Sequence, residues 1–142
     1  FDLLSIDIDS CDWQVWHSLQ EFQPKIVVIE GNTEILPGVW QVHQEGVCQG
    51  SSFTALVELG ERKGYKLVCH TGNLIFVITS LVDRLGLDPI HLEFPHTLFN
   101  YARHHEELAY QLKLRESSES GQTLLGRVVS KVLRAFSGKK SG

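Results

Sequence analysis

Apolar and polar positions in the first 80 residues predict four β-strands. Apolar residues alternate with polar ones over Leu3–Asp9, the period expected of a strand. "KIVVIE", residues 25–30, is an unbroken β-branched run, which is typical of a parallel strand covered on both faces. "YKLVCH" and "LIFVIT" predict two more strands, and the short "TGN" between them requires an antiparallel hairpin.

Two helices are predicted between these strands. The first has apolar residues at helical spacing and ends before Pro24; these residues are Trp13, Val15, Trp16, Leu19 and Phe22. Ser51 or Ser52 is expected to cap the second, which ends where Gly64 can adopt a left-handed conformation. The glycine-rich stretch 31–50 has no sustained period and is predicted to be a long, functional loop. The pattern therefore predicts an α/β fold with one reversed strand.

The pattern changes after Pro89. Residues 96–116 predict an exposed helix, "SSESG" a linker, and "TLLGRVVSKVLRAF" a basic amphipathic helix. We accordingly divide the chain into a partial α/β domain at 1–88, a helical extension at 89–116, and a linker with a basic helix at 117–142.

Composition indicates a globular protein. The 142 residues are 42% hydrophobic, and no apolar run reaches the roughly 18 residues that cross a bilayer. The three cysteines form no C-x-x-C pair, which favours a reducing compartment, and we expect the cytoplasm. The chain begins at Phe1 and contains no methionine, so we interpret it as a fragment or a processed product.

Charge is divided unevenly along the chain. Residues 1–121 hold 8 basic and 17 acidic side chains, whereas residues 122–142 hold 5 basic and no acidic ones. The apolar stripe of the basic segment can pack on protein or on an anionic membrane surface. We expect packing on protein, because the acidic body offers a complementary surface. We expect no nucleic-acid partner.

Carboxylates gather where two of the predicted strands end. Asp7 and Asp9 end the first strand, and Glu30 ends the second. Ligands of open α/β sheets bind outside the carboxyl ends of the strands, so these three side chains are predicted to line one crevice. An alternative is structural, because Asp9 or Ser10 can cap the following helix and Asp12 can face its dipole.

Four segments, in this order and spacing, resemble the C-terminal half of FkbM-type S-adenosylmethionine-dependent methyltransferases. The resemblance covers residues 2 to about 83. The four segments are "LLSIDIDSCDWQVWHSL", "PKIVVIEGN", "GSSFTALVELGERKGYKLV" and "GNLIFV". Ser10 stands where the family has glycine, and Cys11 where it commonly has asparagine or alanine. Serine suits a helix cap but not a positive φ, so the resemblance leaves the shape of this turn open.

The resemblance implies a Rossmann-like class I methyltransferase sheet with strand order 3-2-1-4-5-7-6 and an antiparallel strand 7. The chain would begin at strand 4, without the glycine-rich turn and the strand-2 acid that hold the cofactor, and it contains no G-x-G-x-x-G. We therefore expect an isolated fragment to be inactive, to bind S-adenosylmethionine negligibly, and to pair with the missing N-terminal half or with itself through its open edge.

The function implied is methyl transfer, with a small-molecule or sugar hydroxyl as the acceptor. Asp9, Asp7 and Glu30 are the expected catalytic residues, and Asp7 and Asp12 are expected to contact the cofactor. Asn32 and Trp40 are the expected substrate contacts in the long loop.

Two other classes of function stay open. An Asp-x-Asp pair also occurs in metal-dependent phosphatases and glycosyltransferases, although the downstream acids Asp83 and Asp88 do not complete a phosphatase pattern. A non-catalytic binding module is the other alternative. The histidines lack a metal-binding spacing, and we expect no bound metal.

Overall fold

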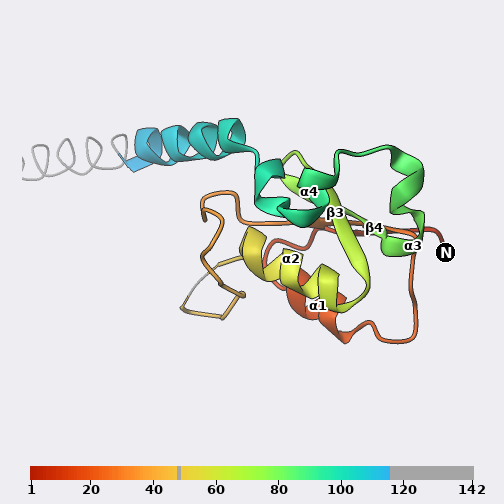
Figure 1. Cartoon of the computed structure of the whole chain (residues 1–142). Helices are drawn as coiled ribbons and strands as arrows, with labels where there is room; N and C mark the ends of the chain where they lie inside the picture. Colours follow the sequence, from red (N-terminus) through yellow and green to blue (C-terminus); the bar gives the residue numbers. More distant parts are fainter. Residues whose placement is uncertain (48, 116–142) are drawn as a thin grey trace, which may run out of the picture. The chain divides into compact units, whose positions relative to one another are not determined.

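The computed structural model describes residues 1–47 and 49–115. The chain forms two compact units, Phe1–His105 and Glu106–Gly142. The first contains the whole sheet (Figure 1). In the second, residues 106–115 are helical, and the predicted linker and basic helix at 117–142 lie outside the described residues.

The first unit is built on a mixed four-stranded sheet in the order β1-β2-β4-β3. The strands are β1 (Leu3–Ile6), β2 (Ile26–Glu30), β3 (Tyr65–His70) and β4 (Asn73–Ile78). β1 and β2 run parallel, and β4 is antiparallel to both of its neighbours. The predicted α/β class and the predicted hairpin are therefore confirmed. The hairpin carries a bulge between Leu67 and Cys69.

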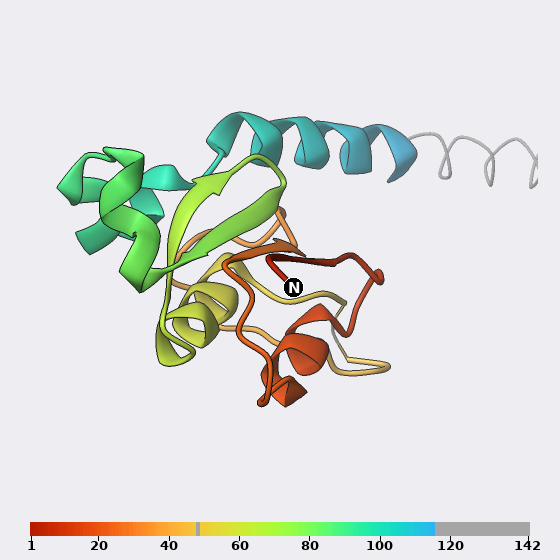
Figure 2. The same cartoon turned by 90° about the vertical axis from the view of Figure 1, so that its right-hand side faces the viewer.

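Two helices, α1 (Asp12–Ser18) and α2 (Phe53–Arg62), pack on the same side of the sheet (Figures 1 and 2). The core lies between these helices and the sheet. Trp16 of α1 is fully buried, and its ring lies 4.9 Å from that of Phe76 and 5.7 Å from that of Tyr65. The Ser52 side chain accepts a hydrogen bond from the N–H of Ala55 and caps α2, as the sequence predicts.

Close packing of α2 on the sheet depends on Gly60. A Cβ at this position would lie 2.6 Å from Cε1 of Phe76 and 3.1 Å from Cη2 of Trp16. Both rings are fully buried, so neither can move away cheaply. A glycine in the helix interior is therefore retained for contact with the sheet, although it lowers helix propensity.

The opposite face of the sheet is only partly covered. Short helical segments follow β4, and Val82 among them is buried; the segments are α3 (Thr79–Val82), η1 (Asp83–Leu85), α4 (Pro89–Glu93) and η2 (Pro95–Leu98). Ile26 of β2 is 38% exposed, whereas Val27 and Ile29 are fully buried. The prediction that both faces of β2 are covered is thus wrong at Ile26.

Two predicted helix boundaries are also wrong. α1 ends at Ser18 instead of continuing to Phe22, because Leu19 is extended. The later helix begins at residue 101 instead of 96, and the side chain of Asn100 accepts the N–H of Arg103 at its start. Among the helices that the structure describes, none combines the length and the apolar character needed to cross a membrane.

Two buried histidines, His70 and His104, form hydrogen bonds that connect the segment after η2 to the rest of the first unit. The N–H of Asn100 donates to Nδ1 of His70 at 3.0 Å. Nδ1 of His104 lies 2.6 Å from the carbonyl oxygen of Thr33. Phe99 is buried between these contacts, with its ring 5.0 Å from that of His70 and 6.0 Å from that of His104. The contact of His104 with Thr33 thereby links this segment to the loop after β2.

Candidate functional site

The turn between β1 and α1 places two of the predicted site residues. β1 ends at Ile6, so the prediction of a strand through Asp9 is wrong. Asp9 has a φ of 64°, and aspartate is one of the few residues that tolerate this left-handed region. Among the described residues Asp9, and not Ser10, has the positive φ, so serine in place of the family's glycine causes no strain here. Asp7 and Asp9 thus lie just beyond the carboxyl end of β1.

Glu30 brings a third carboxylate to the same place, because β2 is parallel to β1 and also ends there. Oxygen atoms of Asp7, Asp9 and Glu30 all lie within 4.8 Å of one another. We call these three side chains the carboxylate cluster. The structure therefore brings together the three side chains that the sequence places at the ends of two neighbouring strands.

The surroundings of Glu30 change the pKa of its carboxyl group. Burial raises the pKa of Glu30, and the nearby charges of Asp7, Asp12 and Asp9 raise it further, as does a hydrogen bond with Asp7. The ion pairs Lys25–Asp2 and Lys66–Glu61 do not involve the carboxylate cluster, and within residues 1–47 and 49–115 no basic side chain pairs with Asp7, Asp9 or Glu30. The cluster is therefore an uncompensated negative site that would favour a cation or a hydrogen-bond donor.

Asp12 has a structural role in the turn. Its side chain is buried, and Oδ1 accepts the N–H of Ile8 at 3.1 Å. The prediction that Asp9 or Ser10 caps α1 is wrong, because Cys11 is the N-cap residue and makes no side-chain cap bond. Asp12 does lie in the first turn, where its charge faces the positive end of the helix dipole.

The long loop contains the two predicted substrate contacts, and the structure places them differently. Asn32 follows β2 closely, but its amide already donates to Gln49 O and accepts the N–H of Glu34. Trp40 is 55% exposed, and its Nε1 donates to Oε2 of Glu58 on α2. Asn32 therefore shapes the loop beside the carboxylate cluster, while the recorded polar partner of Trp40 belongs to α2.

Two further polar residues stand near the first turn of α1 and were not identified from the sequence. Nε2 of Gln14 donates to the carbonyl of His43 at 2.8 Å, and Nδ1 of His43 accepts the N–H of Gly50. Oε1 of Gln14 is buried and has no hydrogen-bond partner within the described residues. No sequence signal marks this pair, because a long loop brings the two residues together.

The carboxylate cluster offers chemistry of two kinds. Three carboxylate oxygens at this separation could hold a hard divalent cation, with water completing its coordination. The same oxygens could accept hydrogen bonds from a hydroxyl or an amino group, and the raised pKa of Glu30 makes its carboxylate a better proton acceptor than an ordinary glutamate.

No protein-family model matches the chain, and comparisons with curated proteins and with solved structures likewise find no match.

Proposed function

We propose that this chain forms part of an S-adenosylmethionine-dependent methyltransferase that methylates a hydroxyl group of a small molecule or a sugar. The observation that carries the proposal is the carboxylate cluster at the joint ends of β1 and β2. Sheet topology supports it. The order β1-β2-β4-β3, with β4 antiparallel, is the order 4-5-7-6 that the resemblance implies for this half of the family's sheet.

The three carboxylates have distinct roles in this proposal. Asp7 and Asp9 orient the acceptor hydroxyl, and Glu30 accepts its proton, because a raised pKa makes this carboxylate more basic. Methyl transfer itself depends mainly on alignment of the nucleophile with the methyl carbon. S-adenosylmethionine supplies the activated methyl group when bound, and its positive charge is compatible with the negative cluster.

Residues of this chain fit only part of that cofactor's pocket. Asp7 is exposed at the cluster, whereas the carboxylate of Asp12 already accepts the Ile8 N–H, so Asp7 is the better placed of the two expected cofactor contacts. The glycine-rich turn and the strand-2 acid belong, by the resemblance, to strands outside this sequence. The activity test is therefore made on the complete gene product that contains these 142 residues.

The test compares Asp9→Asn with Asp2→Asn in methyl transfer from tritiated S-adenosylmethionine to a panel of hydroxylated small molecules and sugars. Asparagine tolerates the left-handed conformation of Asp9, so the fold is kept. We expect Asp9→Asn to lower turnover about 100-fold or more. Asp2, an exposed residue paired with Lys25, is the matched control and should leave turnover unchanged. Unchanged turnover with a lower melting temperature in Asp9→Asn would instead assign Asp9 a structural role.

A metal-dependent function is the second candidate. It is favoured by one specific observation, the clustering of the three carboxylates within 4.8 Å without a basic partner among the described residues. Titration with Mn²⁺, followed by electron paramagnetic resonance, separates the two candidates. Stoichiometric Mn²⁺ binding that Glu30→Gln abolishes, together with a metal requirement for turnover, would favour this class. A non-catalytic binding module would bind the acceptor or the cofactor without turnover.

A further inference from the structure

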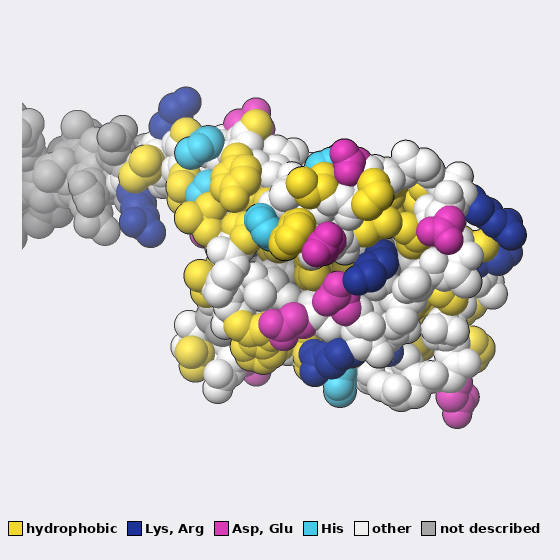
Figure 3. Space-filling view, viewed as in Figure 1, with side chains coloured by type: hydrophobic (Ala, Val, Ile, Leu, Met, Phe, Trp, Pro, Cys, Tyr) yellow, Lys and Arg dark blue, Asp and Glu magenta, His cyan; other side chains and the backbone are white. Residues whose placement is uncertain are grey.

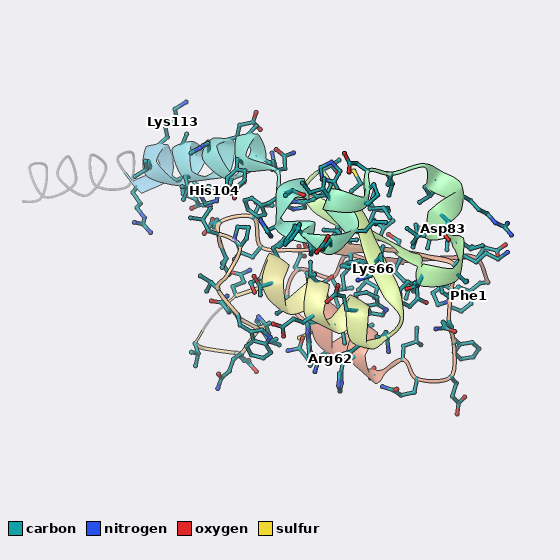
Figure 4. All side chains as sticks on the ribbon, viewed as in Figure 1. Phe1, Arg62, Lys66, Asp83, His104 and Lys113 are labelled. Carbon is teal, nitrogen blue, oxygen red and sulfur yellow. The ribbon has the colours of Figure 1, made fainter. Side chains whose placement is uncertain are left out.

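A small hollow opens where α1 and α2 end, away from the carboxylate cluster at the start of α1. Its volume is about 170 Å³, and it is lined by His17, Gln20, Leu59, Arg62 and Lys63. His17 and Arg62 occupy the last turns of their helices. Figure 3 shows dark blue and cyan side chains together at the lower edge of the molecule, where Figure 4 labels Arg62. Three basic residues therefore converge on one concave site.

The two permanent cations of this hollow lack a carboxylate partner within the described part of the chain. Nζ of Lys63 donates to the carbonyl of Leu19 at 2.7 Å, and Nε of Arg62 donates to the carbonyl of Glu58 at 3.3 Å. An ammonium has three donors and a guanidinium has five, so most of their hydrogen-bonding capacity is unused.

Acidic residues on the same helix are occupied elsewhere. The carboxylate of Glu58 accepts Nε1 of Trp40, and that of Glu61 pairs with Lys66. Neither acid therefore neutralises Arg62 or Lys63 in the structure. Burial also lowers the pKa of Lys63, as expected for an ammonium that is partly removed from water without a counter-ion.

The walls of the hollow are held in place by packing. The imidazole of His17 is stacked on the indole of Trp13, with ring centroids 4.6 Å apart and an angle of 8° between the planes. Nε1 of Trp13 in turn donates to the carbonyl of Ala55. Leu59 is 2% exposed and belongs to the hydrophobic core. The donors around the hollow are thus carried by ordered elements, which reduces the entropic cost of binding.

We propose that this hollow binds a phosphate group, held by the Arg62 guanidinium and the Lys63 ammonium with His17 and Gln20 at its rim. A guanidinium matches the geometry of phosphate oxygens in a bidentate contact, and a lysine adds a point charge beside it. The small volume admits one phosphate group, so any further part of a phosphate ester extends into solvent. This binding is independent of the methyltransferase proposal.

The test is a titration of the isotope-labelled complete gene product that contains these 142 residues with inorganic phosphate, monitored by amide chemical shifts at pH 7 and constant ionic strength. We expect saturable shifts at His17, Gln20, Arg62 and Lys63, with no equivalent response to sodium chloride. Arg62→Gln and Lys63→Gln should each weaken phosphate binding by roughly tenfold, as is typical for loss of a hydrogen bond to a charged group. Lys66→Gln removes a cation that is already paired, and it should leave the affinity unchanged.

A parallel titration with ribose 5-phosphate identifies the source of the group. Tighter binding than inorganic phosphate would assign the site to phosphate esters, and equal binding would assign it to the free ion; both results support the proposal. Shifts that chloride reproduces, or an affinity that Arg62→Gln leaves unchanged, would overturn it. Arg62 is exposed, so its variant tests the proposal even if Lys63→Gln disturbs the end of α1.

Discussion

Replacing Glu30 with glutamine should stabilise the first unit while damaging its proposed site. Glu30 shares the carboxylate cluster with Asp7 and Asp9, whose oxygens lie within 4.8 Å. Two unit charges at that separation repel by about 0.9 kcal/mol in water, and by more near a protein surface. Glu30 is partly exposed and solvent screens its neighbours, so we expect a net gain of about 1 kcal/mol at pH 7. Glutamine keeps a donor for the bond to Asp7.

The stabilisation by Glu30→Gln should increase with pH. The pKa of Glu30 is raised above its usual value of 4.5 in the folded state, so the unfolded chain loses the proton first as pH rises. In the wild type, the contribution of Glu30 to the free energy of unfolding is complete below pH 4.5 and is lost as pH rises through the raised pKa. Glu30→Gln avoids that loss, so its advantage should be small at pH 4 and level off above the folded pKa.

Urea denaturation monitored by circular dichroism at pH 4 and pH 7 measures this difference. A stabilisation of about 1 kcal/mol corresponds to roughly 4 °C in the melting temperature of a unit of this size. High salt should reduce the gain, because the repulsion between exposed charges is screened. Equal free energies of unfolding for the wild type and Glu30→Gln at pH 7, or a stabilisation of the same size at pH 4, would refute the view that repulsion between these carboxylates destabilises the folded state.

Three further predictions concern the fold. Gly60→Ala should destabilise the first unit by about 1–3 kcal/mol in urea denaturation, because its Cβ would overlap the ring of Phe76; a cost near zero would contradict the packing described for α2. Ser52→Ala should cost about 1 kcal/mol, because it removes the cap of α2 and the acceptor of the Gln41 N–H, whereas the exposed Ser80→Ala should be neutral. Burial lowers the pKa of His70, although a hydrogen bond to the Gly72 backbone acts in the opposite direction. The stability that neutral His70 contributes is therefore complete above pH 6.5, the ordinary pKa of histidine, and it is lost as pH falls from there towards the lowered pKa. The protection factor of the Asn100 amide against hydrogen exchange should fall over that range in the wild type, and the same fall in His70→Gln would count against this assignment.

Much of the fold could be predicted because its signals are local. Alternation and β-branched runs marked all four strands, and turn chemistry marked the hairpin. The position of Ser52 before an apolar helix predicted its cap. The clustering of Asp7, Asp9 and Glu30 followed from one topological rule, that parallel neighbours end at the same edge of a sheet.

Other features depended on contacts between distant residues and had no local signal. Gly60 is retained because of the rings of Trp16 and Phe76, and a sequence pattern shows it only as an unfavourable helix residue. The left-handed conformation of Asp9 and the structural use of Asp12 arise from the turn as a whole. The contact between Gln14 and His43 requires the long loop to fold back on α1.

We propose that the carboxylate cluster belongs to the cofactor and acceptor site of a methyltransferase. The decisive measurement is a calorimetric titration of S-adenosylhomocysteine into the complete gene product. We predict micromolar binding at one site per chain, weakened about tenfold or more by Asp7→Asn and unaffected by Asp2→Asn, since Asp7 is an exposed member of the cluster and Asp2 pairs with Lys25 elsewhere. Absence of binding in the folded wild-type protein, or equal affinity in Asp7→Asn, would contradict the account.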